Sequence, residues 1–239
     1  GPRLLPREDE DVAACARHAL EHAGVRVLAG RHALRFERAD AARRLWLQDE
    51  AAPLEFDTLL CATGRRPRLQ GLGLEAIGLS TDGPRLAIND YLQTAWPHIH
   101  VAGDVAGPIS STPVAAHQAW YAAVNGLLAP FWSFKVDYRV VPWVTFTDPE
   151  VARVGLSEDE ARAQGIAVDV TRYGIDDLDR AIADSSDEGF VKVLTPPGSD
   201  RILGACIVGA HAGELLPEFV LAMKHGLGLN KLLGTIHAY

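Results

Sequence analysis

Residues able to do chemistry are concentrated in one stretch of the chain, residues 98–123. Its apolar start predicts a short buried strand over 99–102, and Gly103 and Asp104 follow at the carboxyl end of that strand. Glycine allows a close approach between backbone and ligand because it has no Cβ atom. In open α/β sheets, ligands bind beyond the carboxyl ends of the strands, where an acidic side chain can hold a sugar hydroxyl. Asp104 is therefore the first candidate binding residue.

A helix is expected a few residues after this carboxylate. Ser110, Ser111 and Thr112 precede Pro113 and an apolar run that extends to about residue 128. Thr112 suits the N-cap and Pro113 the first helical position, because proline lacks the N–H that would stay unpaired there. The positive end of such a helix favours an anionic ligand.

Two interpretations of this stretch stay open. A flavin uses both features, since its ribitol hydroxyls need an acceptor and its ring edge becomes anionic on reduction. The alternative is an ordinary strand, loop and helix of an α/β domain, in which Asp104 is a turn residue.

A second candidate binding position is Gly64. It follows a predicted buried strand over 57–62, so the backbone there could approach a ligand closely. Arg65 and Arg66 beside it could serve phosphates, and the alternative is a basic surface turn.

Composition limits the classes of partner. The chain has 239 residues, is 48% hydrophobic and carries a formal charge of −8, so it can form one large domain or two modest ones. The negative charge argues against nucleic acid, and no apolar run approaches the roughly 20 residues that span a bilayer. Cys15, Cys61 and Cys206 form no CxxC pair, which favours a reducing cytoplasm over a disulfide scaffold. The histidines lack ligand spacing, so we expect no metal site.

The remaining elements are predicted from apolar spacing and turn residues. In the first half we expect a helix over 6–24, strands at 25–29, 33–37 and 44–48, and a turn-rich connector at 69–97. In the second half we expect strands at 140–146, 151–154, 168–173, 189–195 and 202–209, and helices at 157–164 and 212–225. Strands followed by a terminal helix are typical of an α+β module separate from the first half.

Three motifs stand in a fixed order along the chain. They are DTLLCATGRRP at 57–67, HVAGDVAG with STPVA at 100–115, and VPWVTFTDPEVARVGLSEDEA at 141–161. Together they resemble the flavin-dependent pyridine nucleotide-disulfide oxidoreductases, a family that includes dihydrolipoamide dehydrogenase, glutathione reductase and mercuric reductase. RILGACIVGAHAGELL at 201–216 and TIHAY at 235–239 extend the resemblance over nearly the whole chain.

The resemblance implies a three-part α/β layout. Residues 1–60 correspond to the end of an NAD(P)-binding domain and 61–135 to the returning segment of an FAD-binding domain. Residues 136–239 correspond to a truncated α+β dimerisation domain that makes a homodimer. We expect the chain to be a piece of a longer polypeptide, with the CxxxxC redox pair and the GxGxxG loop before residue 1.

The resemblance also implies cofactor-binding residues. Asp104, next to Gly103, matches an aspartate that binds the flavin ribitol. Ser111 and Thr112 match the helix start beside the isoalloxazine ring. The implied chemistry is a relay in which NADH or NADPH reduces FAD, FAD reduces a cysteine pair, and that dithiol reduces the substrate.

For the nicotinamide nucleotide, the resemblance implies two contacts. Gly64 matches a backbone contact near the nucleotide, and Ala33 is placed near its adenine. Because the redox cysteine pair is expected outside this sequence, neither Cys15, Cys61 nor Cys206 is expected to take part in the relay.

Tyr239 occupies the position at which disulfide-reducing members carry a histidine base. Tyrosine titrates at about pH 10 and is a poor base at neutral pH. Mercuric reductase-like members use tyrosine there, at a metal-thiolate site, whereas His237 matches a structural histidine. Tyr239 is therefore the candidate catalytic residue, and a mercuric reductase-like enzyme acting on a small molecule, disulfide or metal-thiolate is the expected function. Alternatives are a dihydrolipoamide dehydrogenase, a soluble transhydrogenase, or a catalytically inert dimerisation fragment.

Overall fold

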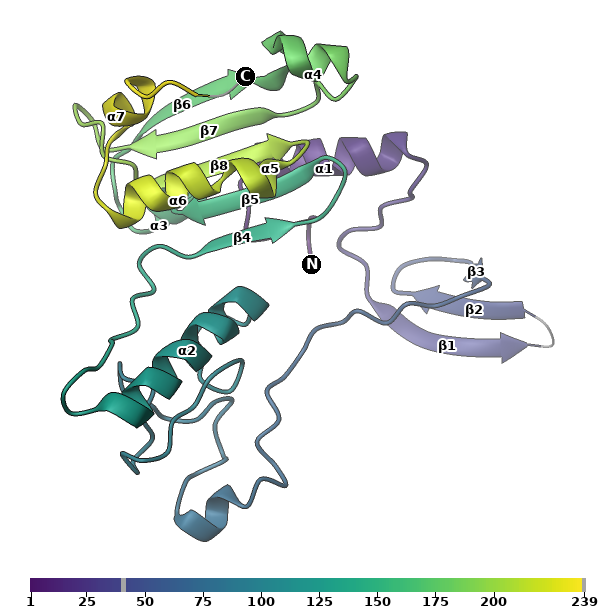
Figure 1. Cartoon of the computed structure of the whole chain (residues 1–239). Coiled ribbons are helices and arrows are strands. Elements are labelled where there is room, and N and C mark those ends of the chain that lie inside the picture. Colours follow the sequence, from purple (N-terminus) through teal and green to yellow (C-terminus); the bar gives the residue numbers. More distant parts are fainter. Residues whose placement is uncertain (40–41, 238–239) are drawn as a thin grey trace. The chain divides into compact units, whose positions relative to one another are not determined.

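The computed structural model describes residues 1–39 and 42–237. The chain forms two compact units, one made of Gly1–Leu59 with Arg139–Tyr239 and the other of Leu60–Tyr138. Figure 1 shows the elements of both units, and each unit is described by itself.

The first unit begins with helix α1 (Glu10–His22). Glu10 and Asp11 stand in its first turn, where the helix dipole favours negative charge. Its buried face consists of Val12, Ala13, Ala16 and Ala19. The predicted helix is confirmed, although it starts at residue 10 and not at residue 6.

A small antiparallel sheet follows in the order β1-β2-β3. Its strands are β1 (Ala33–Ala39), β2 (Ala42–Leu47) and β3 (Leu54–Phe56). The strands predicted at 33–37 and 44–48 are confirmed, whereas those predicted at 25–29 and 57–62 are wrong. An apolar run becomes a strand only where a neighbour takes its backbone hydrogen bonds, and Leu60 is instead 88% exposed.

The main sheet of this unit has five antiparallel strands in the order β4-β5-β8-β7-β6. Each expected strand of the second half is present; the observed strands are β4 (Pro142–Thr145), β5 (Glu150–Gly155), β6 (Asp169–Gly174), β7 (Phe190–Thr195) and β8 (Gly204–Gly209). Alternating side chains of β8 enter two different cores, because successive residues of a strand point to opposite faces. Ala205 and Ile207 lie on one face, and Cys206 and Val208 on the other.

Helices cover both faces of this sheet (Figure 1). On one face lie α5 (Ala212–Leu215) and α6 (Pro217–Lys224), and on the other lies α1. The prediction of a single helix over 212–225 is wrong, because Pro217 lacks an N–H and starts a new helix. The remaining short elements are α3 (Glu158–Ala163), η2 (Ile175–Asp177), α4 (Asp179–Ala183) and α7 (Leu229–Leu233).

The second unit is built around helix α2 (Thr112–Leu128) and the short helix η1 (Leu74–Ile77). The buried strand predicted at 99–102 is wrong as a sheet element, since His100 makes only an isolated bridge with Gln93. Backbone hydrogen bonds join Val101 to Leu92 and Thr94 to Ile99, so this segment has a hydrogen-bonded neighbour on one side. A sheet strand needs neighbours along its length, and within the described residues this segment has them only there.

Candidate functional site

The predicted site loop begins at Gly103. Its φ of +86° lies in the left-handed region, which glycine adopts without strain. The N–H of Ala106 donates to the Gly103 carbonyl at 2.9 Å, so residues 103–106 form a tight turn. Asp104 stands in this turn, half-buried. Among the described residues, no side chain pairs with its carboxylate, which leaves both oxygens available to a ligand.

Gln118 of α2 holds this loop. Its side chain is fully buried, and its Oε1 accepts from the Gly103 N–H at 2.7 Å. Its Nε2 donates to the Gly107 carbonyl at 3.1 Å and to the Tyr138 hydroxyl at 2.6 Å. One amide thus fixes both ends of the loop that carries Asp104. Buried polar groups of this kind are retained only when they are fully hydrogen-bonded.

The start of α2 lies next to the loop, because a Cβ atom on Gly103 would contact that of Ala115 at 3.8 Å. Ser111 is the N-cap, and its Oγ accepts from the Val114 N–H at 3.3 Å. The prediction of Thr112 as the N-cap is wrong by one residue, because Thr112 is the first residue of the helix. The helix has 17 residues, so its exposed start offers N–H groups and positive potential beside Asp104.

A second buried amide fixes the far end of α2. Asn125 donates to the carbonyls of Tyr91 at 3.0 Å and Phe134 at 2.9 Å, and it accepts from the Phe134 N–H at 2.7 Å. Sequence reasoning missed both Gln118 and Asn125. Their spacing of seven residues places them on one helix face with Val114, and two amides on the buried face of an otherwise apolar helix are the signal that could have found them.

A pocket of about 390 Å³ opens beside the same loop. It is lined in part by Arg85, Gly107 and Tyr138. Arg85 lies directly against Gly107, where a Cβ atom would collide with its side chain. The loop therefore offers a free carboxylate, a helix start and a guanidinium within one unit, and this set of groups fits an anionic, polyhydroxylated cofactor.

The other predicted site residues are placed separately. Gly64 belongs to the second unit and has a φ of +119°, with open space where a side chain would be. Ala33 is exposed and begins β1 in the first unit. Tyr239 lies outside the described residues. The structure thus brings together Gly103, Asp104 and Ser111 with Thr112, and it leaves the nucleotide contacts of Gly64 and Ala33 as predictions.

Comparison with known families gives two matches that lie one after the other along the chain. The family described as pyridine nucleotide-disulphide oxidoreductase matches residues 1–119. The dimerisation domain of pyridine nucleotide-disulphide oxidoreductases matches residues 141–239. None of the helices in the described residues is both long enough and apolar enough to cross a membrane.

Individual relatives agree with this. The chain is 36% identical over 249 residues to a dihydrolipoyl dehydrogenase of Thermus scotoductus, covering 100% of this chain and 52% of that protein. It is 33% identical over 243 residues to a mercuric reductase of Lysinibacillus sphaericus, covering 99% and 44%. The solved structure of the HOCl-induced flavoprotein disulfide reductase RclA from Escherichia coli superposes with a TM-score of 0.89 at 26% identity, covering 98% of this chain and 54% of that one.

The chain spans about half the length of the curated relatives that it matches. The two family matches together cover most of the chain and include the Asp104 loop, the start of α2 and the five-stranded sheet. The chain belongs to the pyridine nucleotide-disulphide oxidoreductase family.

Proposed function

We propose that this chain is part of a homodimeric FAD-dependent oxidoreductase that takes electrons from NAD(P)H, with mercuric reductase-like chemistry. The observation that carries the proposal is the placement of Asp104. Its carboxylate is free, and Gln118 holds its loop beside the start of a 17-residue helix. A flavin needs this combination, because it has hydroxyls that donate and a ring that becomes anionic.

Each residue of the site has a separate role in this proposal. Asp104 accepts hydrogen bonds from the ribitol hydroxyls, and Gly103 keeps the backbone clear of the cofactor. Ser111 and Thr112 present the first N–H groups of α2 to the isoalloxazine edge. The bound FAD supplies hydride acceptance from NAD(P)H and electron transfer to a dithiol, whereas the protein binds and orients it. Gly64 and Ala33 are assigned to the nicotinamide nucleotide.

The substrate end of the reaction rests on Tyr239. A tyrosine at this position favours a metal-thiolate or other small-molecule substrate over a dithiol that needs a histidine base. Dihydrolipoamide oxidation and transhydrogenation remain the alternatives within the enzymes. The three free cysteines support a reducing, cytoplasmic location.

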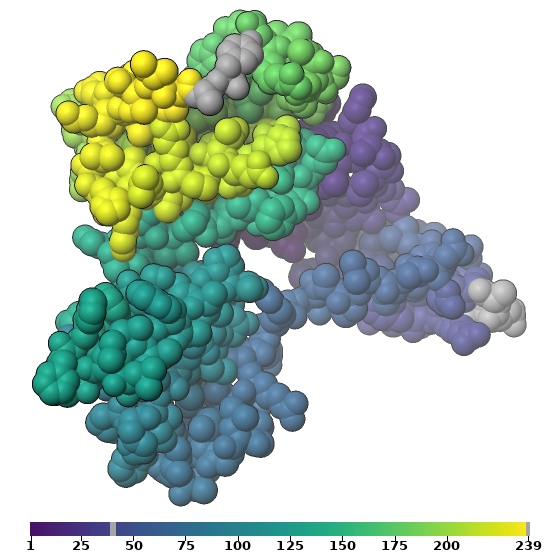
Figure 2. Space-filling model, in the orientation of Figure 1, coloured from purple at the N-terminus to yellow at the C-terminus, as the bar shows by residue number. Residues whose placement is uncertain are grey.

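The dimerisation surface is proposed on the helices α5, α6 and α7. They carry the exposed apolar side chains Leu215, Leu221 and Leu233, the last of which is 82% exposed. In the space-filling view, α6 and α7 (yellow) form an outer surface of their unit (Figure 2). Exposed apolar patches on soluble domains mark association surfaces, so a second copy of the chain is the proposed occupant.

The test is the flavin content of the natural protein that contains this chain. We expect an intact mass near twice that of the 25.8 kDa chain and a flavin spectrum with absorption at about 450 nm. Asp104→Asn should lower the ratio of bound FAD to protein after desalting, because an amide accepts less strongly than a carboxylate. Asp82→Asn, in an exposed turn of the same unit, is the matched control.

Two results would contradict the proposal. A colourless protein with the mass of the chain alone would leave the dimerising fragment as the function. Equal FAD retention in the Asp104→Asn and Asp82→Asn variants would remove Asp104 from the site.

A further inference from the structure

Two buried cations lie in register on the two strands that flank β8 in the five-stranded sheet. Arg153 of β5 and Lys192 of β7 are both paired with Cys206 of β8, so the three side chains form one row across the sheet. We call Arg153 and Lys192 the cation pair. Each is only 1% exposed, and both lie on the face that α1 covers. A buried cation is tolerated only with carboxylate partners, so the source of those partners decides what the pair does.

Arg153 forms ion pairs with carboxylates from two separate segments of the chain. Its Nη1 lies 2.7 Å from Oε2 of Glu160, the residue of α3 that also closes the capping box with Ser157. Its Nε lies 2.8 Å from Glu8 Oε2, and its Nη2 donates to the Arg7 carbonyl at 2.9 Å. The Glu8 contact is an ion pair by distance without a directed hydrogen bond. Glu8 is held in turn by the Trp143 Nε1–H at 2.9 Å.

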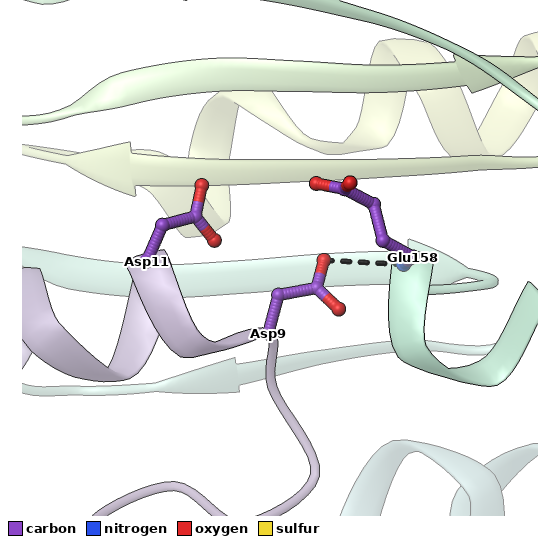
Figure 3. Close-up of side chains that lie close together, drawn as sticks. All are labelled: Asp9, Asp11 and Glu158. Carbon is purple, nitrogen blue, oxygen red and sulfur yellow. Dashed lines mark hydrogen bonds between the residues drawn. The ribbon is translucent and has the colours of Figure 1, made fainter. Parts of the chain in front are cut away.

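Lys192 has the same two-sided arrangement. Its Nζ lies 2.8 Å from Glu158 of α3, 2.9 Å from Asp9 and 2.7 Å from Asp11. These three carboxylates converge on one point, as a metal site would require (Figure 3). The lysine ammonium already occupies that point. Asp9 also accepts from the N–H groups of Glu158 and Asp159, at 3.2 and 3.0 Å, and so caps α3 from outside.

An apolar row lies directly beside the cation pair. Val151, Val208 and Phe190 are paired across β5, β8 and β7 two residues along from Arg153, Cys206 and Lys192. Val12 and Ala16 of α1 pack on this row. The segment from Arg7 to His22 therefore meets the sheet with its acidic start on the cations and its apolar face on the valines, and it covers Cys206.

We propose that Arg153 and Lys192 form an ionic latch that holds residues 7–22 on the dimerisation domain, and that opening of this latch exposes Cys206 while the sheet stays folded. The reason lies in how the charges are divided. When residues 7–22 leave, Arg153 keeps Glu160 and Lys192 keeps Glu158, both from the dimerisation domain itself. The sheet therefore retains one carboxylate for each cation, and only Glu8, Asp9 and Asp11 depart.

The latch joins the two family-matched regions of the chain. Residues 7–22 fall within the match at 1–119, and the cation pair falls within the dimerisation domain at 141–239. The latch consists of ion pairs within this chain, so it does not depend on the proposed redox function. Release would free the amino-terminal segment from the domain that sets the oligomer.

The state of the latch can be measured through Cys206. Burial raises the pKa of this thiol to about 12, with Glu8 adding to the rise and the neighbouring Lys192 and Arg153 opposing it. A thiol of that kind is inert toward alkylation until it is uncovered. Cys61 is exposed and lies in the other unit, so it serves as an internal reference within the same molecule.

The experiment is isotope-coded iodoacetamide labelling of the folded protein, with mass spectrometry to separate the cysteine peptides. We expect Glu8→Gln with Asp9→Asn to speed labelling of Cys206 by about a hundredfold relative to the wild type, because it removes carboxylates from buried cations. Labelling of Cys61 and hydrogen exchange of the β7 and β8 amides should stay unchanged. Lys192→Met, which leaves three carboxylates without a cation, should act in the same direction.

Arg180→Gln is the matched control, because it removes one cation from an exposed i,i+4 pair with Asp184 in the same unit. It should leave Cys206 labelling at the wild-type rate. Unchanged labelling in the Glu8→Gln, Asp9→Asn double variant would overturn the proposal. Faster labelling accompanied by equal loss of protection in β7 and β8 would also overturn it, because the sheet would then be unfolding with the helix. The double variant keeps the cation pair intact, so the test holds even where Lys192→Met fails to fold.

Discussion

A single amide, Gln118, connects helix α2 to the loop that carries the candidate flavin ligand. It satisfies the Gly103 N–H, the Gly107 carbonyl and the Tyr138 hydroxyl at once. Water cannot easily take over these hydrogen bonds, because the Gln118 side chain is fully buried. Asp104 is thus positioned by a residue that makes no contact with the cofactor in the proposed site.

We predict that Gln118→Met lowers the free energy of unfolding of the second unit by about 1–3 kcal/mol, because it leaves buried polar groups without partners at nearly constant volume. Chemical denaturation followed by tryptophan fluorescence measures the change. Gln70→Met, at an exposed position of the same unit, is the control. A loss no larger than that of the control would show that the hydrogen bonds of Gln118 contribute nothing to stability.

At the scale of elements, the start of α2 has a defined cap. Ser111 has an extended backbone and accepts from Val114, whereas Thr112 is the first residue inside the helix. We predict that Ser111→Ala destabilises the chain by about 1 kcal/mol, the usual cost of losing an N-cap, and that Thr112→Ala has a clearly smaller effect. Denaturant midpoints at constant m-value measure both. The reverse order would restore Thr112 as the cap.

The contact between α1 and the sheet gives a dependence on pH. Burial raises the pKa of Asp9. Hydrogen bonds from Lys192 and from the N–H groups of Asp159 and Glu158 together lower it by a larger amount, so the net pKa is below its ordinary 3.8. Burial likewise raises the pKa of the Glu160 carboxyl, but hydrogen bonds from Arg153 and Ser157 lower it by more, so that the pKa is below its ordinary 4.5. A carboxyl group whose pKa is lowered in the folded state stabilises that state. The stabilisation is fully present above the pKa of the unfolded state, and it is lost as the pH falls through the pKa of the folded state.

We therefore predict that this contribution is constant above about pH 5 and declines below about pH 4. Thermal denaturation followed from about pH 5 down to about pH 3 should show a steeper loss in the wild type than in the Asp9→Asn variant, which has no carboxyl to titrate at this position. Identical pH profiles for the two proteins would mean that Asp9 is not held as a charged partner of Lys192.

At the scale of the whole molecule, the helices of the dimerisation domain carry apolar side chains that remain exposed in the single chain. Leu221 of α6 and Leu233 of α7 are both exposed. We predict that Leu221→Asp converts a dimer to a monomer in sedimentation-velocity measurements, because a buried unpaired carboxylate opposes association. Ile182→Asp, at an exposed position of α4, should leave the dimer intact. Dissociation by both variants, or by neither, would move the interface away from α6.

The sequence by itself determined what depends on neighbours along the chain and on patterns spread over its full length. The Ser157–Glu160 capping box, the apolar run at 202–209 and the ordered family motifs each predicted their element or family correctly, because such signals are short-range or cumulative. The strands expected at 57–62 and 99–102 failed, since pairing partners decide a strand and apolar content alone cannot supply them.

Only the tertiary structure decided which distant residues share a site. Arg153 and Lys192 are 39 positions apart; strand register makes both of them neighbours of Cys206, and the packing of α1 on the sheet brings its acidic start to them. Gln118 likewise has its role because the fold brings it against the loop at Gly103, which lies 15 residues earlier in the chain. The physical reason is that hydrogen bonds and buried ion pairs act over a few ångströms in space, whereas spacing along the sequence records only contacts within a single element.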